Sequence, residues 1–248
     1  MDIPKNFNNN YGKWFITDVI RAITSYGLIE TGEEVCVALS GGRDSTTLLY
    51  ILWYLKTYSH LDFNLCALHV LIDDYDTKGL SGLCAELGVK YLESRLRVGK
   101  CTPAKNVCSI CSHLKRGAMV EALKGTGIRK VAFGHHADDV AETLFMNIVF
   151  NRRLGSFTPK VEIPEGEIII IRPLVYLDGP LIKRLHTYFK LPAVLHICPY
   201  EDTGVRQSMR RAISGIEEQL EMKDFSRMVV SALENVDLSN MWMNLQDK

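Results

Sequence analysis

The stretch that decides the fold is Ser40-Gly41-Gly42-Arg43-Asp44-Ser45-Thr46, which joins an apolar, β-rich run at 34–39 to a helical pattern at 45–56. Adjacent glycines permit a tight turn whose backbone N–H groups converge, and the following helix directs its positive dipole end to the same point. The hydroxyl groups of Ser40 and Ser45 add two donors. The stretch therefore predicts a phosphate-binding loop. The alternative is an ordinary glycine-rich turn with Asp44 as the helix N-cap.

Strand and helix patterns alternate over most of the chain. We expect strands at 34–39, 63–72, 91–96 and 130–133, and helices at 14–26, 45–56, 77–87, 109–123 and 138–150. Such alternation builds βαβ units, so the sequence predicts an α/β fold with a doubly wound parallel sheet and an N-terminal helix. A turn at 164–166 predicts a hairpin within 160–176. Beyond Asp178 the pattern is mostly helical, which predicts a core at 1–178 and a C-terminal helical extension at 179–248.

Composition places the protein among ordinary globular chains. Of its 248 residues, 47% are hydrophobic and 23% are charged, which excludes wholesale disorder. No apolar run approaches the roughly 18–20 residues of a membrane helix, and the amino end has no apolar signal region, so we expect a cytoplasmic protein without a membrane partner. Its seven cysteines should then stay reduced, which makes thiolate chemistry available.

Charge is unevenly distributed although 29 basic residues balance 29 acidic ones. Residues 94–120 contain six Lys or Arg and no Asp or Glu, and residues 143–161 and 179–200 contain three each, again without acids. Such segregation can create a basic surface on a neutral protein and indicates a nucleic-acid partner. The alternative is ordinary solvated charge on helix faces.

Two cysteines open a predicted helix inside the most basic stretch, in Cys108-Ser109-Ile110-Cys111. Two thiols at this spacing can ligate one metal centre, and the helix dipole and nearby cations lower their pKa. Cys198 is the only later cysteine, and three thiolates would leave one iron of a 4Fe-4S cluster open. Half of a zinc site, a redox pair and chance are the alternatives for the first pair.

A third motif, Gly134-His135-His136-Ala137-Asp138-Asp139-Val140-Ala141-Glu142-Thr143, completes a layout that is more specific than its parts. The stretch at 40–45 resembles the Ser-Gly-Gly-x-Asp-Ser signature of the PP-loop ATP pyrophosphatases. The whole layout resembles their TtcA/TtuA-type tRNA sulfurtransferases, above all the tRNA 2-thiocytidine synthetases (TtcA type). Cys-Ser-x-Cys-Ser, Gly-His-His-x-Asp-Asp, Glu-Thr-Leu-Phe and Ile-Arg-Pro-Leu at 171–174 carry the likeness, which covers essentially the whole chain.

The resemblance assigns roles to these motifs. It implies that ATP is bound by the loop and the third motif, at Ser40, Gly41, Gly42, Arg43, Asp44, Ser45, Gly134 and His135. Asp44 would also hold Mg²⁺, and Lys115 would be a catalytic or phosphate-binding cation. Of Asp138 and Asp139, one would serve as a Mg²⁺ ligand or proton acceptor and the other would cap a helix. Cys108, Cys111 and Cys198 would ligate a 4Fe-4S cluster whose open iron holds the sulfur.

The same resemblance implies a reaction and partners. ATP would adenylate an oxygen of a tRNA base, and sulfur would replace that oxygen, converting cytidine to 2-thiocytidine. Sulfide or a cysteine desulfurase would donate the sulfur, and relatives are often dimeric, which leaves a homodimer open. Candidate RNA-binding side chains are Arg116, Arg152, Arg153, Arg206 and Arg210. For Lys115 and Arg116 the alternative is solvated helix charge. For Arg206 and Arg210 it is surface ion pairing with Glu217 and Glu218.

One departure from the family keeps other functions open. Acidic Glu201 and Asp202 follow Cys198, which is unexpected beside a polyanionic substrate. A PP-loop sulfurtransferase that acts on another nucleotide or a small molecule is therefore the first alternative. A cluster-free amide- or lysidine-forming PP-loop ligase is the second, and a binding module without turnover is the third.

Overall fold

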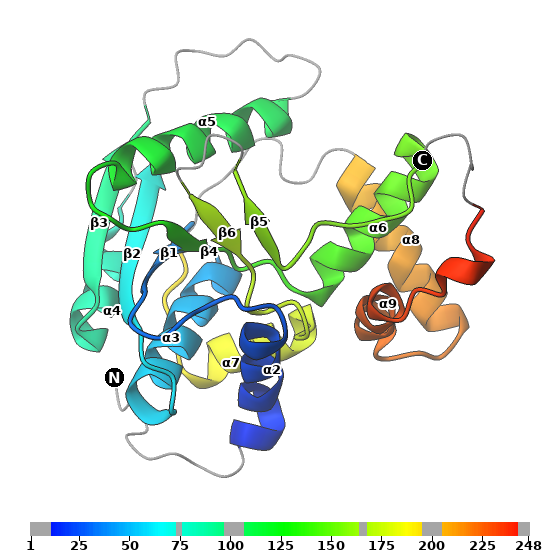
Figure 1. The fold of residues 1–248 in the computed structure, drawn as a ribbon, viewed down its shortest axis with the longest axis horizontal. Coiled ribbons are helices and arrows are strands. Elements are labelled where there is room, and N and C mark those ends of the chain that lie inside the picture. The colour runs from blue at the N-terminus through cyan, green and yellow to red at the C-terminus, as the bar shows by residue number, and fades with distance from the viewer. Residues whose placement is uncertain (1–10, 73–75, 97–106, 164–167, 195–204, 243–248) are drawn as a thin grey trace.

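The computed structural model describes residues 11–72, 76–96, 107–163, 168–194 and 205–242, with 107–109 described by their backbone only. A six-stranded sheet in the order β3-β2-β1-β4-β6-β5 lies at its centre (Figure 1). Every neighbouring pair is parallel except β5 and β6, which confirms the predicted hairpin. The strands are β1 (Glu34–Ala38), β2 (Asn64–Leu71), β3 (Lys90–Arg95), β4 (Lys130–Ala132), β5 (Lys160–Glu162) and β6 (Ile169–Ile171).

Helices cover both faces of the sheet, so the predicted doubly wound α/β fold is confirmed. One face packs in a common core with α2 (Thr17–Ser25), α3 (Arg43–Tyr58), α4 (Lys78–Leu87) and α7 (Gly179–Tyr188). The other face packs against α5 (Val107–Leu123) (Figure 1). Side chains alternate along β1, where Val35 faces the first core and Cys36 faces the second. Each fully buried aliphatic side chain stabilises the fold by about 1.5–3 kcal/mol.

Three helices form a separate layer beside the sheet: α6 (Ala137–Asn151), α8 (Val205–Gln219) and α9 (Phe225–Glu234) (Figure 1). They share a small core of Ala141, Met209 and Ile213. α9 is also tied to α2, because Arg21 Nη2 lies 2.9 Å from Glu234 Oε2. No helix in the described ranges is both long and apolar enough to cross a lipid bilayer.

The first helix differs from the prediction at its start. A π-helical turn at Gly12–Ile16 precedes α2, where the sequence predicted one continuous helix at 14–26. The Thr17 hydroxyl donates to the Gly12 carbonyl at 2.7 Å across this wider turn, and the ring of Phe15 packs against that of Phe189. Tertiary packing of the aromatic side chains therefore accompanies the wider turn. Gly27 follows the helix at φ +55°, as expected for a helix end.

Candidate active site

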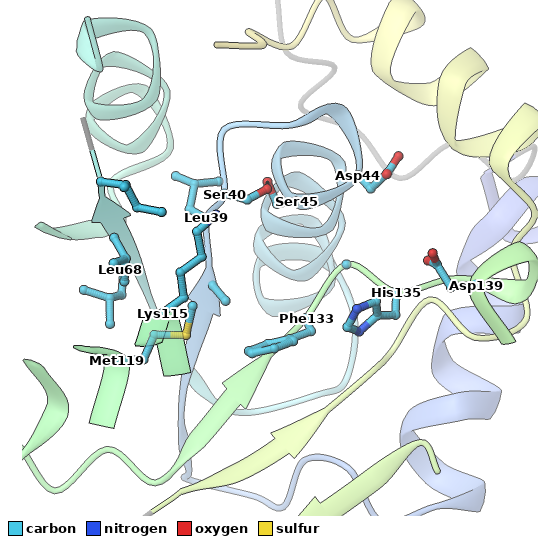
Figure 2. Close-up of a pocket in the computed structure, with 14 residues that line it drawn as sticks. Leu39, Ser40, Asp44, Ser45, Leu68, Lys115, Met119, Phe133, His135 and Asp139 are labelled. Atoms are coloured by element: carbon cyan, nitrogen blue, oxygen red, sulfur yellow. Dashed lines mark hydrogen bonds between the residues drawn. The ribbon is translucent and has the colours of Figure 1, made fainter. Parts of the chain in front are cut away.

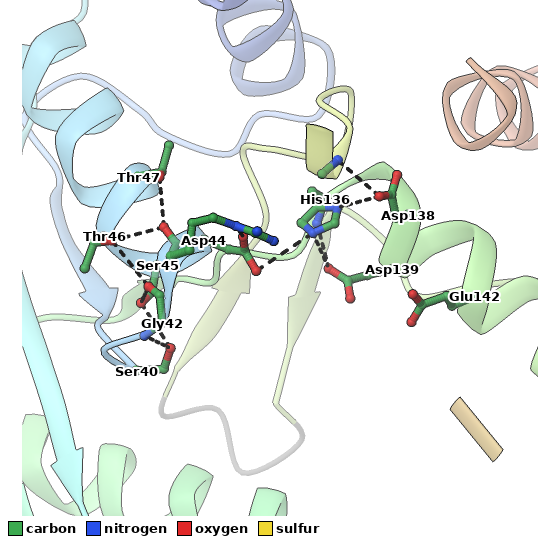
Figure 3. A network of polar contacts seen from close by, with 12 residues as sticks. Ser40, Gly42, Asp44, Ser45, Thr46, Thr47, His136, Asp138, Asp139 and Glu142 are labelled. Carbon is green, nitrogen blue, oxygen red and sulfur yellow. Dashed lines mark hydrogen bonds and ion pairs between the residues drawn. The ribbon is translucent and has the colours of Figure 1, made fainter. Parts of the chain in front are cut away.

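The loop between β1 and α3 is closed by its own hydroxyl groups. Ser40 Oγ lies 3.0 Å from Ser45 Oγ, and Ser45 Oγ donates to the Gly42 carbonyl at 2.9 Å (Figure 3). Gly41 has φ +88°, and a Cβ there would lie 3.2 Å from Val194 Cβ, so both backbone conformation and space favour glycine. α3 starts directly after the loop, with its free N–H groups and positive dipole end at this point. This is the geometry in which helix N-termini bind phosphate.

The loop between β4 and α6 packs directly against the first loop. A Cβ at Gly134 would lie 3.0 Å from the backbone carbonyl of Asp44 and 3.1 Å from Ser45 N. These neighbours are backbone atoms at the start of α3, which have little freedom to move away. Glycine at 134 therefore allows the two loops to share one site.

His136 lies among three carboxylates that come from both loops (Figure 3). Its Nε2 is 3.9 Å from Asp44 Oδ2 and 3.7 Å from Asp139 Oδ2, and its Nδ1 is 4.0 Å from Asp138 Oδ2. Its side chain is 9% exposed, so a buried ring lies between carboxylates that are themselves partly exposed. Among the described residues, no three His, Cys, Asp or Glu side chains are arranged to hold a metal ion. A Mg²⁺ ion at Asp44 would therefore need phosphate oxygens as further ligands, which is how Mg²⁺ commonly binds.

The two adjacent aspartates have different partners. Asp139 Oδ2 accepts from His136 N at 3.0 Å in a capping box at the start of α6, and Asp139 also lines the cavity described next. Asp138 Oδ2 accepts from Gly179 N, the first residue of α7, at 3.1 Å. One aspartate thus both caps a helix and faces the cavity, whereas the sequence analysis gave these roles to two residues.

A cavity of about 260 Å³ lies beside the phosphate-binding loop (Figure 2). Its polar lining includes Ser40, Asp44, Ser45, Lys115, Gly134, His135 and Asp139. Its apolar lining includes Leu39, Leu68, Val70, Met119 and Phe133. Lys115 reaches the cavity from α5, on the opposite face of the sheet from α3. The structure therefore brings most of the predicted ATP-binding and catalytic residues to one place, with an apolar part suited to a flat base.

His135 is held as a neutral hydrogen-bond donor. Arg172 Nε donates to His135 Nδ1 at 3.3 Å, and since a guanidinium only donates, Nδ1 is the acceptor and the ring proton is on Nε2. Burial lowers the pKa of His135 to about 4. Arg172 itself donates to the Thr158 carbonyl at 2.5 Å and lies 4.7 Å from the ring centre of Phe157. His135 can therefore donate to an uncharged ring nitrogen or carbonyl in the cavity, but it is not a base at neutral pH.

Two arginines of α8 pair with acids of α6. Arg210 Nε lies 2.6 Å from Glu142 Oε1, and Glu142 has a side chain only 2% exposed. Arg206 Nη1 lies 3.4 Å from Asp139 Oδ1 and 3.7 Å from Glu142 Oε2. Both arginines are therefore ion-paired, but with Asp139 and Glu142 of α6 rather than with the expected Glu217 and Glu218. Their pairing ties α8 to the start of α6.

The cysteines divide into core and candidate ligands. Cys36, Cys66 and Cys84 are buried in the core, and a hydrogen bond with Cys66 together with burial raises the pKa of Cys36. Cys111 is partly exposed on α5, one helical turn before Lys115. The backbone of Cys108 lies in the first turn of α5; its side chain and the whole of Cys198 lie outside the described residues. The three-cysteine cluster remains a prediction.

The remaining predicted RNA-binding residues lie apart. Arg116 is on α5 near Arg172, and its charge adds to burial in lowering the pKa of Arg172 to about 10. Arg152 and Arg153 are exposed at the far end of α6 from His136. Arg43 pairs with Asp44, with Nε and Oδ1 3.1 Å apart, so its charge lies at the start of α3.

Sequence reasoning missed two contributors to the site. Glu142 belongs to the third motif, but no role was predicted for it. Its position three residues after Asp139 places both side chains on the same face of a helix, which could have indicated that Glu142 belongs to the site. Gly179 carried no signal at all, because its contact with Asp138 spans 41 positions.

Comparison with known proteins identifies the fold family. The model of a family described as a PP-loop domain matches residues 15–191. The chain belongs to the PP-loop family. Similar PP-loop proteins include the tRNA-cytidine(32) 2-sulfurtransferase of Idiomarina loihiensis, 32% identical over 94% of this chain and 80% of the relative. The protein of the same name from Deinococcus radiodurans is 35% identical over 81% of this chain and 68% of the relative. The resemblance deduced from the motifs is therefore confirmed.

A solved structure of another protein shares the fold. The U34-tRNA thiolase NcsA from Methanococcus maripaludis, solved with its 4Fe-4S cluster, is 21% identical and superposes with a TM-score of 0.68. The match covers 89% of this chain and 79% of that one. At this identity the likeness establishes the architecture, and it extends beyond the residues matched by the PP-loop family.

Proposed function

We propose that this PP-loop protein is an ATP-dependent tRNA sulfurtransferase that converts cytidine to 2-thiocytidine. The observation that carries the proposal is the 32% sequence identity, over 94% of the chain, to a tRNA-cytidine(32) 2-sulfurtransferase. The cavity supports it, because a phosphate-binding loop, a lysine and an aspartate line one space with an apolar part.

The reaction replaces a carbonyl oxygen, which is a poor leaving group. In the first step, the O2 atom of cytidine attacks the α-phosphorus of ATP, an O–P bond forms, and pyrophosphate leaves with the electrons of the broken bond. In the second step, a hydrosulfide adds at C2, AMP departs with the former O2 atom, and loss of the sulfur-bound proton leaves the C=S group. ATP, cytidine and hydrosulfide thus give 2-thiocytidine, AMP and pyrophosphate.

The chain's own residues bind and orient the reactants in this scheme. The loop N–H groups and the hydroxyls of Ser40 and Ser45 hold the departing pyrophosphate, where negative charge develops. Lys115 supplies a positive charge from the facing helix α5. The neutral His135 donates from Nε2 to a base or ribose atom. Asp139 faces the cavity as a proton acceptor.

Two further groups would be held by side chains of this protein in the proposed reaction. Mg²⁺ at Asp44 and the phosphate oxygens would offset charge on the pyrophosphate, because a carboxylate and phosphate oxygens are ligands that this hard cation prefers. A 4Fe-4S cluster at Cys108, Cys111 and Cys198 would supply a soft iron position for sulfide. Cys111 is accessible and one turn from cavity-lining Lys115, which suits that role. Sulfide or a cysteine desulfurase is the proposed donor.

The test is anaerobic reconstitution of the full chain with iron and sulfide, followed by reaction with ATP, Mg²⁺, sulfide and an unmodified tRNA transcript. Mass spectrometry of the nucleosides should detect 2-thiocytidine, with one pyrophosphate released for each sulfur inserted. Asp44→Asn should abolish pyrophosphate release, whereas Glu86→Gln, an exposed carboxylate on α4, should not.

Cluster binding is measured separately from activity. Cys111→Ala should lower bound iron and the visible absorption of the cluster, and Cys84→Ala, which removes a buried core thiol, should lower neither. Pyrophosphate release without any thiolated nucleoside would favour a different substrate. Wild-type thiolation by Cys108→Ala and Cys198→Ala would exclude the cluster.

A further inference from the structure

The end of α6 and the loop after it form an unusual surface, which we call the α6 end surface. Four large apolar side chains are exposed there: Ile148 is 43%, Val149 58%, Phe150 57% and Leu154 58% exposed. Arg152 and Arg153 lie between them in the sequence and are also exposed. Exposed apolar groups gathered in this way mark interaction sites more often than isolated ones do.

The backbone that presents this surface is fixed by hydrogen bonds. Asn147 Nδ2 donates to the Gly155 carbonyl at 2.7 Å, and the Asn147 carbonyl accepts from Arg153 N at 3.0 Å. Arg152 ends the helix at φ +50°, a left-handed conformation that arginine adopts at a cost of roughly 1 kcal/mol relative to glycine. Lys190 and Glu221 follow the ends of α7 and α8 in the same conformation, so at Arg152 it serves to end α6 and turn the chain into the following loop.

Charge indicates the kind of partner. Between Glu142 and Glu162 the sequence has no acidic residue. Within the described part of the chain, neither Arg152 nor Arg153 forms an ion pair, whereas Arg206 and Arg210 are both paired with acids. The surface therefore presents two uncompensated cations beside an exposed phenyl ring, which is the combination that binds phosphates and stacks on unpaired bases.

We propose that the α6 end surface binds the RNA substrate, with Arg152 and Arg153 on backbone phosphates and Phe150 stacked on an unpaired base. The inference rests on the proposed function and adds a docking surface away from the cavity. A second copy of the chain fits less well. A two-fold contact places the same patch on both subunits, which would gather four arginines without a carboxylate from the patch itself.

The experiment measures binding of the full-length protein to an unmodified tRNA transcript over a range of salt concentrations. Arg152→Ala/Arg153→Ala should weaken binding on the order of 10-fold at low salt and reduce the slope of log affinity against log salt by about 1 per arginine. The control is Lys56→Ala/Lys90→Ala, which removes two exposed cations at the end of α3 and the start of β3. It should leave the slope unchanged.

Phe150 tests the stacking part. Phe150→Ala should weaken binding about 5- to 150-fold, the range expected for loss of one base–aromatic stack. Phe150→Leu should bind tRNA as weakly as Phe150→Ala, because leucine is apolar but has no ring. Phe150→Trp should bind tRNA with the wild-type affinity, because it keeps an aromatic ring. Far-UV circular dichroism and the melting temperature of each variant verify that it is folded.

Three outcomes would overturn the inference. Wild-type tRNA affinity and salt slope in both the arginine and Phe150→Ala variants would exclude this surface and leave the proposed function intact. Sedimentation in which Phe150→Ala turns a wild-type dimer into a monomer, with equal effects of leucine and tryptophan, would assign the surface to a second copy. No tRNA binding by the wild type at any salt concentration would reject the proposed function as well.

Discussion

Gly179, the first residue of α7, offers a direct test of the acidic cluster through one added methyl group. In Gly179→Ala the new Cβ would lie 2.6 Å from Asp138 Oδ2 and 3.4 Å from His136 Cε1. To reach ordinary contact the carboxylate must move by about 0.8 Å, because closer contacts are repulsive. That movement lengthens the 3.1 Å hydrogen bond from Gly179 N beyond a useful distance.

The energy follows from opposing effects. Loss of a hydrogen bond to a charged group costs about 1.5–3 kcal/mol. Replacing glycine by alanine raises the free energy of unfolding by about 0.4–1 kcal/mol, because it lowers the conformational entropy of the unfolded chain. Asp138 has a side chain 32% exposed, so water replaces part of the lost bond and the net destabilisation should be about 1 kcal/mol. The effect on the rate should be larger, because Asp138 lies beside His136 at the start of α6, and a misplacement of roughly 1 Å that spreads from there to the cavity can lower the rate about 100-fold.

Urea unfolding and ATP-dependent pyrophosphate release measure these two effects on the same protein. The matched control is Gly82→Ala in α4, where nothing lies within 4 Å of an added Cβ. The free energy of unfolding of that variant should rise by about 0.4–1 kcal/mol, and its pyrophosphate release should equal that of the wild type. Gly179→Ala with unchanged pyrophosphate release and stability equal to or above wild type would refute the reasoning.

Four further predictions concern the same framework. Gly134→Ala should lower the free energy of unfolding by about 1–3 kcal/mol and raise the KM for ATP, because its Cβ meets fixed backbone at 3.0 Å; chemical denaturation and initial rates measure this. Arg210→Ala should cost about 1–3 kcal/mol in urea unfolding, because the buried carboxylate of Glu142 loses its 2.6 Å partner. The pKa of His135 is about 4 in the folded protein, against 6.5 for an unperturbed histidine, so the unfolded chain takes up the extra proton first as pH falls. Stability should therefore decrease between about pH 6.5 and 4, by about 1–3 kcal/mol, and His135→Gln should lack this part of the pH dependence. Arg152→Gly should raise the melting temperature, through a gain of roughly 0.5–1 kcal/mol at a left-handed position.

Each of these predictions has a contradicting result. Wild-type stability of Gly134→Ala would mean that the two loops are not in contact. Full stability of Arg210→Ala, with no recovery by adding Glu142→Gln, would mean that the carboxylate is solvated. Identical pH profiles with and without His135 would exclude its burial in the neutral form, and a lower melting temperature of Arg152→Gly would exclude strain at that position.

The sequence was sufficient to predict the sheet because its signals are local. The strand signal is the apolar run before Ser40, and the paired glycines and the helical pattern follow it directly in the sequence. Each of these three signals agrees with the α/β fold. The hairpin of β5 and β6 followed in the same way from a turn between two β-rich runs. The helix start at residue 12 was missed because tertiary packing, not local pattern, accompanies the π-helical turn.

The site was predictable where residues belong to motifs and not where partners are distant. Lys115 lies 75 positions after Ser40, yet the family resemblance made it a catalytic or phosphate-binding cation, and both residues line the same cavity. Neither pattern nor propensity encodes the contact of Gly179 with Asp138 or that of Arg210 with Glu142, since both depend on how α7 and α8 dock. The proposed core at 1–178 and extension at 179–248, and the role of Cys198, stay predictions.

The length of α6 fixes the distance between the acidic cluster at its start and the arginines after its end. Its fifteen residues begin at the acidic cluster and end at Asn151, just before Arg152, and at 1.5 Å per residue the two ends are about 21 Å apart. A polynucleotide that engages both ends must extend that far, so short fragments would reach only one of them. One residue inserted in the middle of the helix would rotate the arginines by about 100° about the helix axis and leave the cavity residues in place. The protein would then lose its preference for long substrates over short ones but keep its reaction at the cavity.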